Sequence, residues 1–181
     1  MPFNTLLLTE CFLPGQTHYK ESGVEISLQP ESGETVLFFS IDDQSNPNCK
    51  FRQLLGIDKD NQNICDLIVF YAKDNQRMIC FVELKGSDLG RAVKQVCNTD
   101  KFLRQKLNES SSFSNLTAKA FIKLKGSIPQ EHRRYQEELI KHFGDQNFDI
   151  GRTTDFGQFL RGIVRQSKGK RKGKRNKTNR K

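Results

Sequence analysis

Residues 64–85, ICDLIVFYAKDNQRMICFVELK, form the stretch around which we expect the fold to be organised. Two apolar runs, 64–71 and 78–84, flank a polar segment at Asp74-Asn75 that suits a tight reverse turn. Each run is apolar at both odd and even positions, which is typical of a strand that is covered on both faces. The pattern therefore predicts a β-hairpin at the centre of the core.

Three charged side chains, Asp66, Glu83 and Lys85, lie inside these apolar runs. A turn centred on Asp74-Asn75 places Asp66 directly opposite Glu83, with Cβ atoms about 4.5–5.5 Å apart. Lys85 follows Glu83 by two residues and points to the same face. Because two buried like charges destabilise a sheet, we expect a divalent cation such as Mg²⁺, which prefers carboxylate oxygens and water, to neutralise them. The alternative is a simple salt bridge between Glu83 and Lys85 at an exposed edge.

Length and charge indicate one domain with a basic extension. The chain has 181 residues, enough to bury a sizeable core. Of its 30 Lys and Arg residues, nine lie within residues 168–181, which contain no acidic residue. The other 21 basic residues equal the 21 acidic residues in number, so the whole net charge of +9 comes from the C-terminal segment. We expect a domain over 1–166 and a disordered tail over 167–181.

The tail is typical of an arm that binds nucleic-acid phosphates without sequence specificity. A solubilising end or a nuclear address is the alternative interpretation. The expected nucleic-acid-binding residues are Lys168, Lys170, Arg171, Lys172, Lys174, Arg175, Lys177, Arg180 and Lys181.

The five cysteines are odd in number and form no CxxC motif. Free cysteines within apolar runs act as small hydrophobic residues, so we expect a reduced, intracellular protein: cytoplasmic, or nuclear if the source is a eukaryote. Leu6-Leu7-Leu8 is too short for a signal peptide and lacks a basic lead-in. No apolar run is long enough to cross a membrane, so we expect no membrane partner.

In the N-terminal third, residues 1–22 show no clear pattern. Alternating apolar residues predict a strand at 23–29, a turn at Pro30–Glu34 and a returning strand at 35–41. A further short strand is expected at 49–57. The sheet would then begin as an antiparallel meander that leads into the central hairpin.

After Lys85 the pattern becomes helical. Ser87 or Asp88 can cap a helix that begins at Leu89 and continues for about five turns. Gln95 lies two turns into this helix, either beside the charged cluster or facing solvent. Four segments follow. The first is a strand at 116–124, exposed on the face of Lys119, Lys123 and Lys125, and the second is a helix at 130–143 with Tyr135, Leu139, Ile140 and Phe143 inward. A short strand at 147–150 and a closing helix at 154–164 complete the order.

The order of these features resembles the PD-(D/E)XK nuclease superfamily, which has the restriction-endonuclease-like fold. The matching residues are Asp66 in NICDLIVFY, Glu83-Leu84-Lys85 in ICFVELKGSD and Gln95 in GRAVKQV. The resemblance covers roughly residues 49–124. Cys65 stands where the family's motif name has Pro, and an acidic residue on an N-terminal helix, which such sites often use, has no well-placed counterpart among Glu10, Glu21 and Glu25.

The resemblance implies an α/β (α+β) protein with a central mixed sheet flanked by helices and an N-terminal antiparallel strand pair. It implies hydrolysis of phosphodiester bonds, with DNA favoured over RNA, and a possible homodimer because cutting two strands requires two sites. Asp66 and Glu83 would bind Mg²⁺ or Mn²⁺, with the Leu84 carbonyl as a further ligand. Lys85 would orient the attacking water or stabilise the transition state. Gln95 would position water or backbone. Two alternatives remain: an inactive nuclease-like module that binds nucleic acid or assembles with partners, and an unrelated basic RNA-associated protein.

Overall fold

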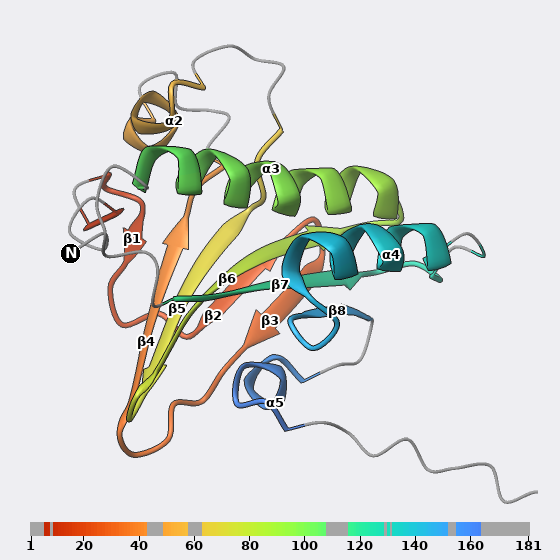
Figure 1. The fold of residues 1–181 in the computed structure, drawn as a ribbon. Coiled ribbons are helices and arrows are strands. Elements are labelled where there is room, and N and C mark those ends of the chain that lie inside the picture. The colour runs from red at the N-terminus through yellow and green to blue at the C-terminus, as the bar shows by residue number, and fades with distance from the viewer. Residues whose placement is uncertain are drawn as a thin grey trace, which may run out of the picture.

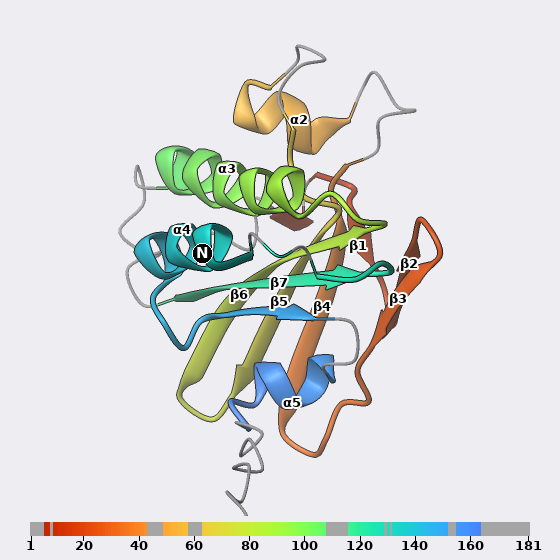
Figure 2. The ribbon, with the colours of Figure 1, turned by 90° about the vertical axis from the view of Figure 1, so that its right-hand side faces the viewer.

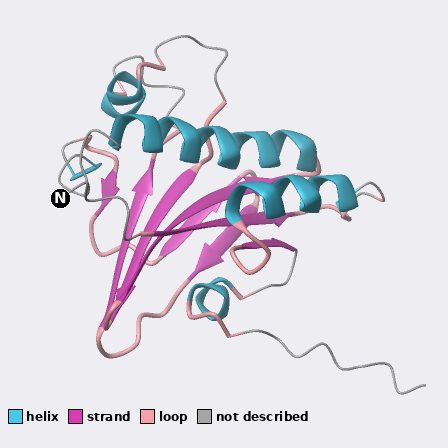
Figure 3. Ribbon diagram, viewed as in Figure 1, coloured by secondary structure: helices cyan, strands magenta, loops and turns pink. Residues whose placement is uncertain are grey.

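The computed structural model describes residues 6–7, 9–42, 49–57, 63–107, 116–128, 130, 132–151 and 155–163. The described residues form a mixed α/β structure with a six-stranded sheet, a two-stranded sheet and four helices (Figures 1 and 3). The strands are β1 (Phe12–Leu13), β2 (His18–Glu21), β3 (Val24–Ser27), β4 (Glu34–Ser40), β5 (Leu67–Lys73), β6 (Gln76–Lys85), β7 (Thr117–Leu124) and β8 (Phe148–Gly151). The helices are α2 (Lys50–Leu55), α3 (Leu89–Leu107), α4 (His132–Phe143) and α5 (Phe156–Leu160).

The six-stranded sheet has the order β1-β4-β5-β6-β7-β8. Strands β1, β4, β5 and β6 pair antiparallel, whereas β6, β7 and β8 pair parallel. Parallel neighbours need a crossover connection, and α3 and α4 supply the two crossovers. The sheet is therefore an antiparallel meander that continues into two β-α-β units.

Helices α3 and α4 cover one face of the sheet, and the β2–β3 ribbon and α5 cover the other (Figure 2). Ile79 and Phe81 of β6 face the helices, whereas Cys80 and Val82 face the ribbon and α5. All four side chains are fully buried. This two-sided burial is the reason that β5 and β6 are apolar at both parities, as the sequence predicts.

The predicted central hairpin is confirmed, including its register. Lys73 pairs with Gln76, and Leu67 pairs with Val82, so the next step along the ladder sets Asp66 beside Glu83. Asp74 has a φ of 53°, a conformation that Asp and Asn tolerate better than most residues.

Two predictions about the N-terminal strands are wrong. Residues 49–57 contain helix α2 and not a strand, because Phe51 and Leu55 lie one helical turn apart and are both buried. Strand β3 does not pair with β4: it forms a hairpin with β2, closed by Ser22 and Gly23, which both have positive φ. The N-terminal antiparallel pair is thus present, but with a different partner strand.

The C-terminal elements follow the predicted order, with two side-chain corrections. The strand at 117–124 is not exposed on one face, because the β2–β3 ribbon and α5 cover that side and Lys119 is only 7% exposed. Ile140 on α4 faces outward at 41% exposure, whereas Leu139 and Phe143 are buried as predicted. None of the helices in the described ranges is both long and apolar enough to span a membrane.

Candidate functional site

The predicted site residues meet at the end of the sheet where β6 leads into α3 (Figure 1). Asp66 immediately precedes β5, Glu83 lies near the end of β6, and Lys85 is the last residue of β6. Asp88 caps the following helix, since its Oδ1 accepts the Arg91 N–H at 2.9 Å. The first turn of α3 therefore begins next to the charged cluster, as the sequence predicts.

Asp66 is held by the backbone of both neighbouring strands. Its carbonyl accepts the Ile41 N–H at 3.1 Å, and its side-chain Oδ2 accepts the Leu84 N–H at 2.7 Å. Burial raises the pKa of Asp66 to about 6, although the Leu84 hydrogen bond and the charge of Lys85 act in the opposite direction. The side chain thus combines a structural hydrogen bond with a carboxylate that is costly to ionise.

Glu83 is fully buried. The Lys85 Nζ lies 2.5 Å from its Oε1, so the two form an ion pair, and 22% of the Lys85 side chain is exposed. Hydrogen bonding from Lys85 and from the backbone of Asp66, together with the charge of Lys85, favours the ionised form of Glu83. Burial and, second, the nearby Asp66 raise the pKa of Glu83 to about 8. A single lysine therefore leaves this carboxylate incompletely compensated.

Gln95 faces the sheet and not solvent, with only 1% of its surface exposed. Its Nε2 donates to the carbonyl of Ile64 at 2.8 Å, while its Oε1 is buried without a hydrogen-bond partner among the described residues. One turn later, the Thr99 Oγ1 accepts the Cys65 N–H at 2.9 Å. Helix α3 thus holds the segment that leads directly into Asp66, and Gln95 is part of that connection.

Two further acidic residues act on Asp66. The charges of Glu21, on β2, and Asp42, just after β4, both raise the pKa of Asp66. Asp42 also pairs with Arg52, with 2.6 Å between its Oδ1 and the arginine Nη2. Sequence reasoning missed Asp42; the available signal was an aspartate directly after a strand that pairs beside Asp66.

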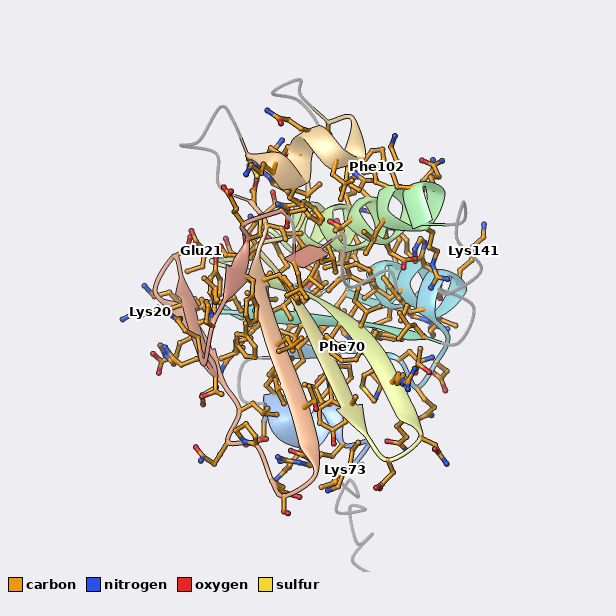
Figure 4. All side chains as sticks on the ribbon, turned by 90° about the vertical axis from the view of Figure 1, so that its left-hand side faces the viewer. Lys20, Glu21, Phe70, Lys73, Phe102 and Lys141 are labelled. Atoms are coloured by element: carbon orange, nitrogen blue, oxygen red, sulfur yellow. The ribbon has the colours of Figure 1, made fainter. Side chains whose placement is uncertain are left out.

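The other N-terminal acids have partners away from Asp66. Glu10 forms an ion pair with Lys50 of α2. Glu25 lies 3.4 Å from the Nε2 of His18, across the β2–β3 ribbon. Of the three N-terminal acids, Glu21 is thus the one that acts electrostatically on the site; it lies at the end of β2 (Figure 4).

Metal-ligand geometry is limited to two carboxylates. Within the described ranges, no group of three or more His, Cys, Asp or Glu side chains is placed to hold a metal ion. Mg²⁺ is commonly held by one or two carboxylates, with water and substrate phosphate completing the shell, so Asp66 and Glu83 meet that smaller requirement. The incompletely compensated carboxylate of Glu83 fits a cation. The nine basic tail residues, Lys168 to Lys181, lie outside the described residues.

No protein-family model matches the chain, and neither the curated proteins nor the solved structures contain a significant match to it. Any function must therefore be argued from the site itself.

Proposed function

We propose that this chain is a metal-dependent nuclease of the PD-(D/E)XK type, with a restriction-endonuclease-like fold, that hydrolyses phosphodiester bonds of nucleic acid. Three features of the fold support this proposal: the antiparallel β5–β6 hairpin, the parallel strand β7 beside it, and the crossover helix α3 between them. Asp66, Glu83 and Lys85 lie at the end of that hairpin, in the order and spacing that the resemblance requires.

The observation that carries the proposal is the incomplete compensation of Glu83. Burying a carboxylate beside a second one is costly, and the raised pKa values of Asp66 and Glu83 express that cost. The ion pair with Lys85 does not fully compensate the buried carboxylate, because the pKa of Glu83 is still raised to about 8. A divalent cation between the two carboxylates would compensate both, and clustered charges of this kind are more often functional than stabilising.

Each residue of the cluster has a distinct role in this proposal. Mg²⁺ or Mn²⁺ would supply a bound water of lowered pKa and would stabilise charge on the phosphate. Asp66 and Glu83 would hold the ion. The Leu84 carbonyl is a further candidate ligand, because the N–H and C=O of one strand residue point toward the same neighbouring strand and the Leu84 N–H already meets Asp66.

Lys85 would stabilise the developing negative charge on the phosphate. Its partial exposure allows the ammonium to reach a substrate, whereas the fully buried Glu83 cannot leave the sheet. Gln95 fits a positioning role better than direct contact, because its amide N–H₂ group is already bound to the Ile64 carbonyl.

The proposed partner is nucleic acid, with DNA favoured over RNA. The tail would bind backbone phosphates nonspecifically and hold substrate near the domain. A homodimer would supply the two sites that cutting both strands of a duplex requires.

A cleavage assay tests the function. The purified chain is incubated with single- and double-stranded DNA and RNA in Mg²⁺ or Mn²⁺, and the Lys85→Ala variant is compared with Lys94→Ala, which removes an exposed lysine on the outer side of α3. We expect Lys85→Ala to lower the cleavage rate by about 100-fold or more while Lys94→Ala retains it. Circular dichroism and thermal melting check that both variants are folded. Intact substrates with every metal and substrate type would refute the enzyme hypothesis.

The second candidate is a nuclease-like module that binds nucleic acid without cutting it. The hydrogen bond from the Leu84 N–H to Asp66 favours this interpretation, because it gives the aspartate a structural role that needs no metal ion. In that case the chain would bind nucleic acid, and Glu83→Gln would change neither that binding nor the response to Mg²⁺.

A further inference from the structure

Lys119 is a buried cation on the face of the sheet opposite to the carboxylate cluster. It lies on β7 beside Cys80 of β6, on the face that α5 covers, and is only 7% exposed. Its Nζ donates to the carbonyl of Phe159 at 3.2 Å and lies 4.9 Å from the centre of the Phe159 ring. No carboxylate of the described residues contributes to its electrostatic environment. Two of the three N–H donors of the ammonium group therefore remain available.

Such a position is expensive for a lysine. The neighbouring residues on this face, such as Cys80 and Phe121, are apolar, and a methionine or leucine would fill the space without burying a charge. Burial lowers the pKa of Lys119 from its ordinary value, and Cys80 only partly opposes this. A buried, uncompensated charge is more typical of a binding site than of a stabilising contact.

A cavity of about 340 Å³ opens next to Lys119, between the turn of the β5–β6 hairpin and the end of α5. No acidic residue lines it. Its charged and polar lining consists of Asn75, Gln76, Arg77, Thr117, Lys119 and Arg161. The lining therefore combines positive charge with hydrogen-bond donors.

The three cations of this cavity are not equivalent. Arg161 is already neutralised, because its Nε and Nη2 donate to the Glu34 carboxylate at 2.8 Å each. Arg77 is exposed, but strand alternation places its side chain on the face of Ile79, opposite to the face of Lys119. Among the described residues that line this cavity, Lys119 thus supplies the uncompensated positive charge on the α5 face, which suits an oxyanion.

A second cavity of about 440 Å³ also reaches Lys119, but Asp145 and Asp149 line it. Carboxylates there repel an anion, so this cavity is the weaker candidate. The cation-lined cavity is the better match for the free donors of Lys119.

We propose that Lys119, together with polar lining residues such as Gln76, forms a binding site for a phosphate-type oxyanion, either a free phosphorylated molecule or a backbone phosphate of nucleic acid. The site is separate from the carboxylate cluster, because Lys119 lies on the α5 face of the sheet and Glu83 lies on the opposite face. It requires neither the metal nor the hydrolytic activity proposed above.

An NMR titration of the full-length chain with inorganic phosphate tests this proposal. We expect chemical-shift changes at the amides of residues 75–78 and 117–119. Lys119→Met should weaken the apparent affinity by about tenfold or more, because it removes a charge-assisted hydrogen bond. It should leave the unfolding temperature unchanged or higher, because a buried charge is removed. Lys141→Met, which removes an exposed lysine on α4, is the matched control (Figure 4).

Gln76→Ala provides a second variant that does not disturb the core, since Gln76 is exposed and lines the same cavity. It should weaken phosphate binding several-fold, and it decides the matter if Lys119→Met does not fold. Repeating the titrations with a nucleoside monophosphate and a short oligonucleotide distinguishes the two sources of phosphate. If Lys119→Met weakens the binding of phosphate and of the mononucleotide, the ligand is a small molecule. If it weakens the binding of the oligonucleotide alone, the ligand is a backbone phosphate. Absence of shifts at these amides with all three ligands, or equal affinities in the wild type and both variants, would overturn the proposal.

Discussion

The Asp66 carboxylate accepts the Leu84 N–H at 2.7 Å and so extends the β5–β6 ladder by one step beyond the end of strand β5. The Asp66 side-chain oxygen thus accepts a hydrogen bond that a backbone carbonyl accepts elsewhere in the ladder. The same bond fixes the carboxylate next to Glu83. The position of Asp66 is therefore set by the hairpin register and not by a flexible loop.

Replacing Asp66 by Asn or Ala separates its structural role from its charge. Asn retains an oxygen that can accept the Leu84 N–H, whereas Ala leaves that buried donor unpaired. We expect Asp66→Ala to lower the free energy of unfolding by about 1–3 kcal/mol relative to Asp66→Asn. Urea denaturation of the metal-free variants measures this difference, and equal stabilities would show that the Leu84 hydrogen bond contributes nothing.

The stability of the metal-free protein should depend on Glu83 and pH. Its pKa is raised from 4.5 to about 8, so between these values the folded state binds more protons than the unfolded state and stability falls as pH rises. Relative to Glu83→Gln, the wild type should lose at most about 1.4 kcal/mol per pH unit across this window. Asp66 is present in both proteins and adds to the slope of each up to a pH of about 6. Denaturation at several pH values checks this, and parallel pH profiles for the two proteins would contradict it.

Divalent cations should restore the stability that the metal-free protein loses as pH rises. A cation at Asp66 and Glu83 stabilises their ionised forms, so Mg²⁺ or Mn²⁺ should raise the unfolding temperature by a few degrees, and more at a pH above 8 than near 5. The shift should disappear in Glu83→Gln and in Asp66→Asn. Thermal melting with and without the metal measures it, and Glu10→Gln serves as a control because Glu10 is exposed and paired with Lys50. A shift of the same size in every variant would place the ion elsewhere.

The central hairpin could be predicted because its determinants are local. Two apolar runs and a polar turn lie within 22 consecutive residues, 64–85, and the turn sets the register that brings Asp66 beside Glu83. The cap of α3 at Asp88 is local in the same way.

The errors concern partners that lie far apart in the sequence. Residues 49–57 have apolar spacing that suits either a strand or a helix, and the burial of Phe51 and Leu55 decides for the helix. The lysines of β7 alternate as if they faced water, yet Lys119 is covered by α5, some 40 residues later in the chain. The sequence left Gln95 either beside the cluster or facing solvent. Its partner, the Ile64 carbonyl, is 31 residues away and could not be inferred from periodicity.

The basic tail should control affinity for nucleic acid but not the chemistry. Deletion of residues 168–181 should weaken binding and flatten the salt dependence by about one unit of slope for each phosphate contact that is lost. The thermal response to Mg²⁺ should stay unchanged, because no tail residue contributes to the carboxylate cluster in this proposal. Binding measured over a series of salt concentrations tests this, and identical slopes with and without the tail would remove its proposed role.

Gln95 should act by holding the segment in front of Asp66. Gln95→Ala leaves the Ile64 carbonyl without its donor, and we expect a loss of about 1–3 kcal/mol in the free energy of unfolding. Because the segment that carries Asp66 would loosen, the apparent affinity for Mg²⁺ should fall as well. Gln95→Glu is the informative companion: it keeps the size of the side chain but replaces the N–H₂ donor, so it should fail to restore the metal affinity. Hydrogen exchange at Cys65 and Asp66 locates the effect. Unchanged protection there, together with lost cleavage, would instead assign Gln95 a direct role at the substrate.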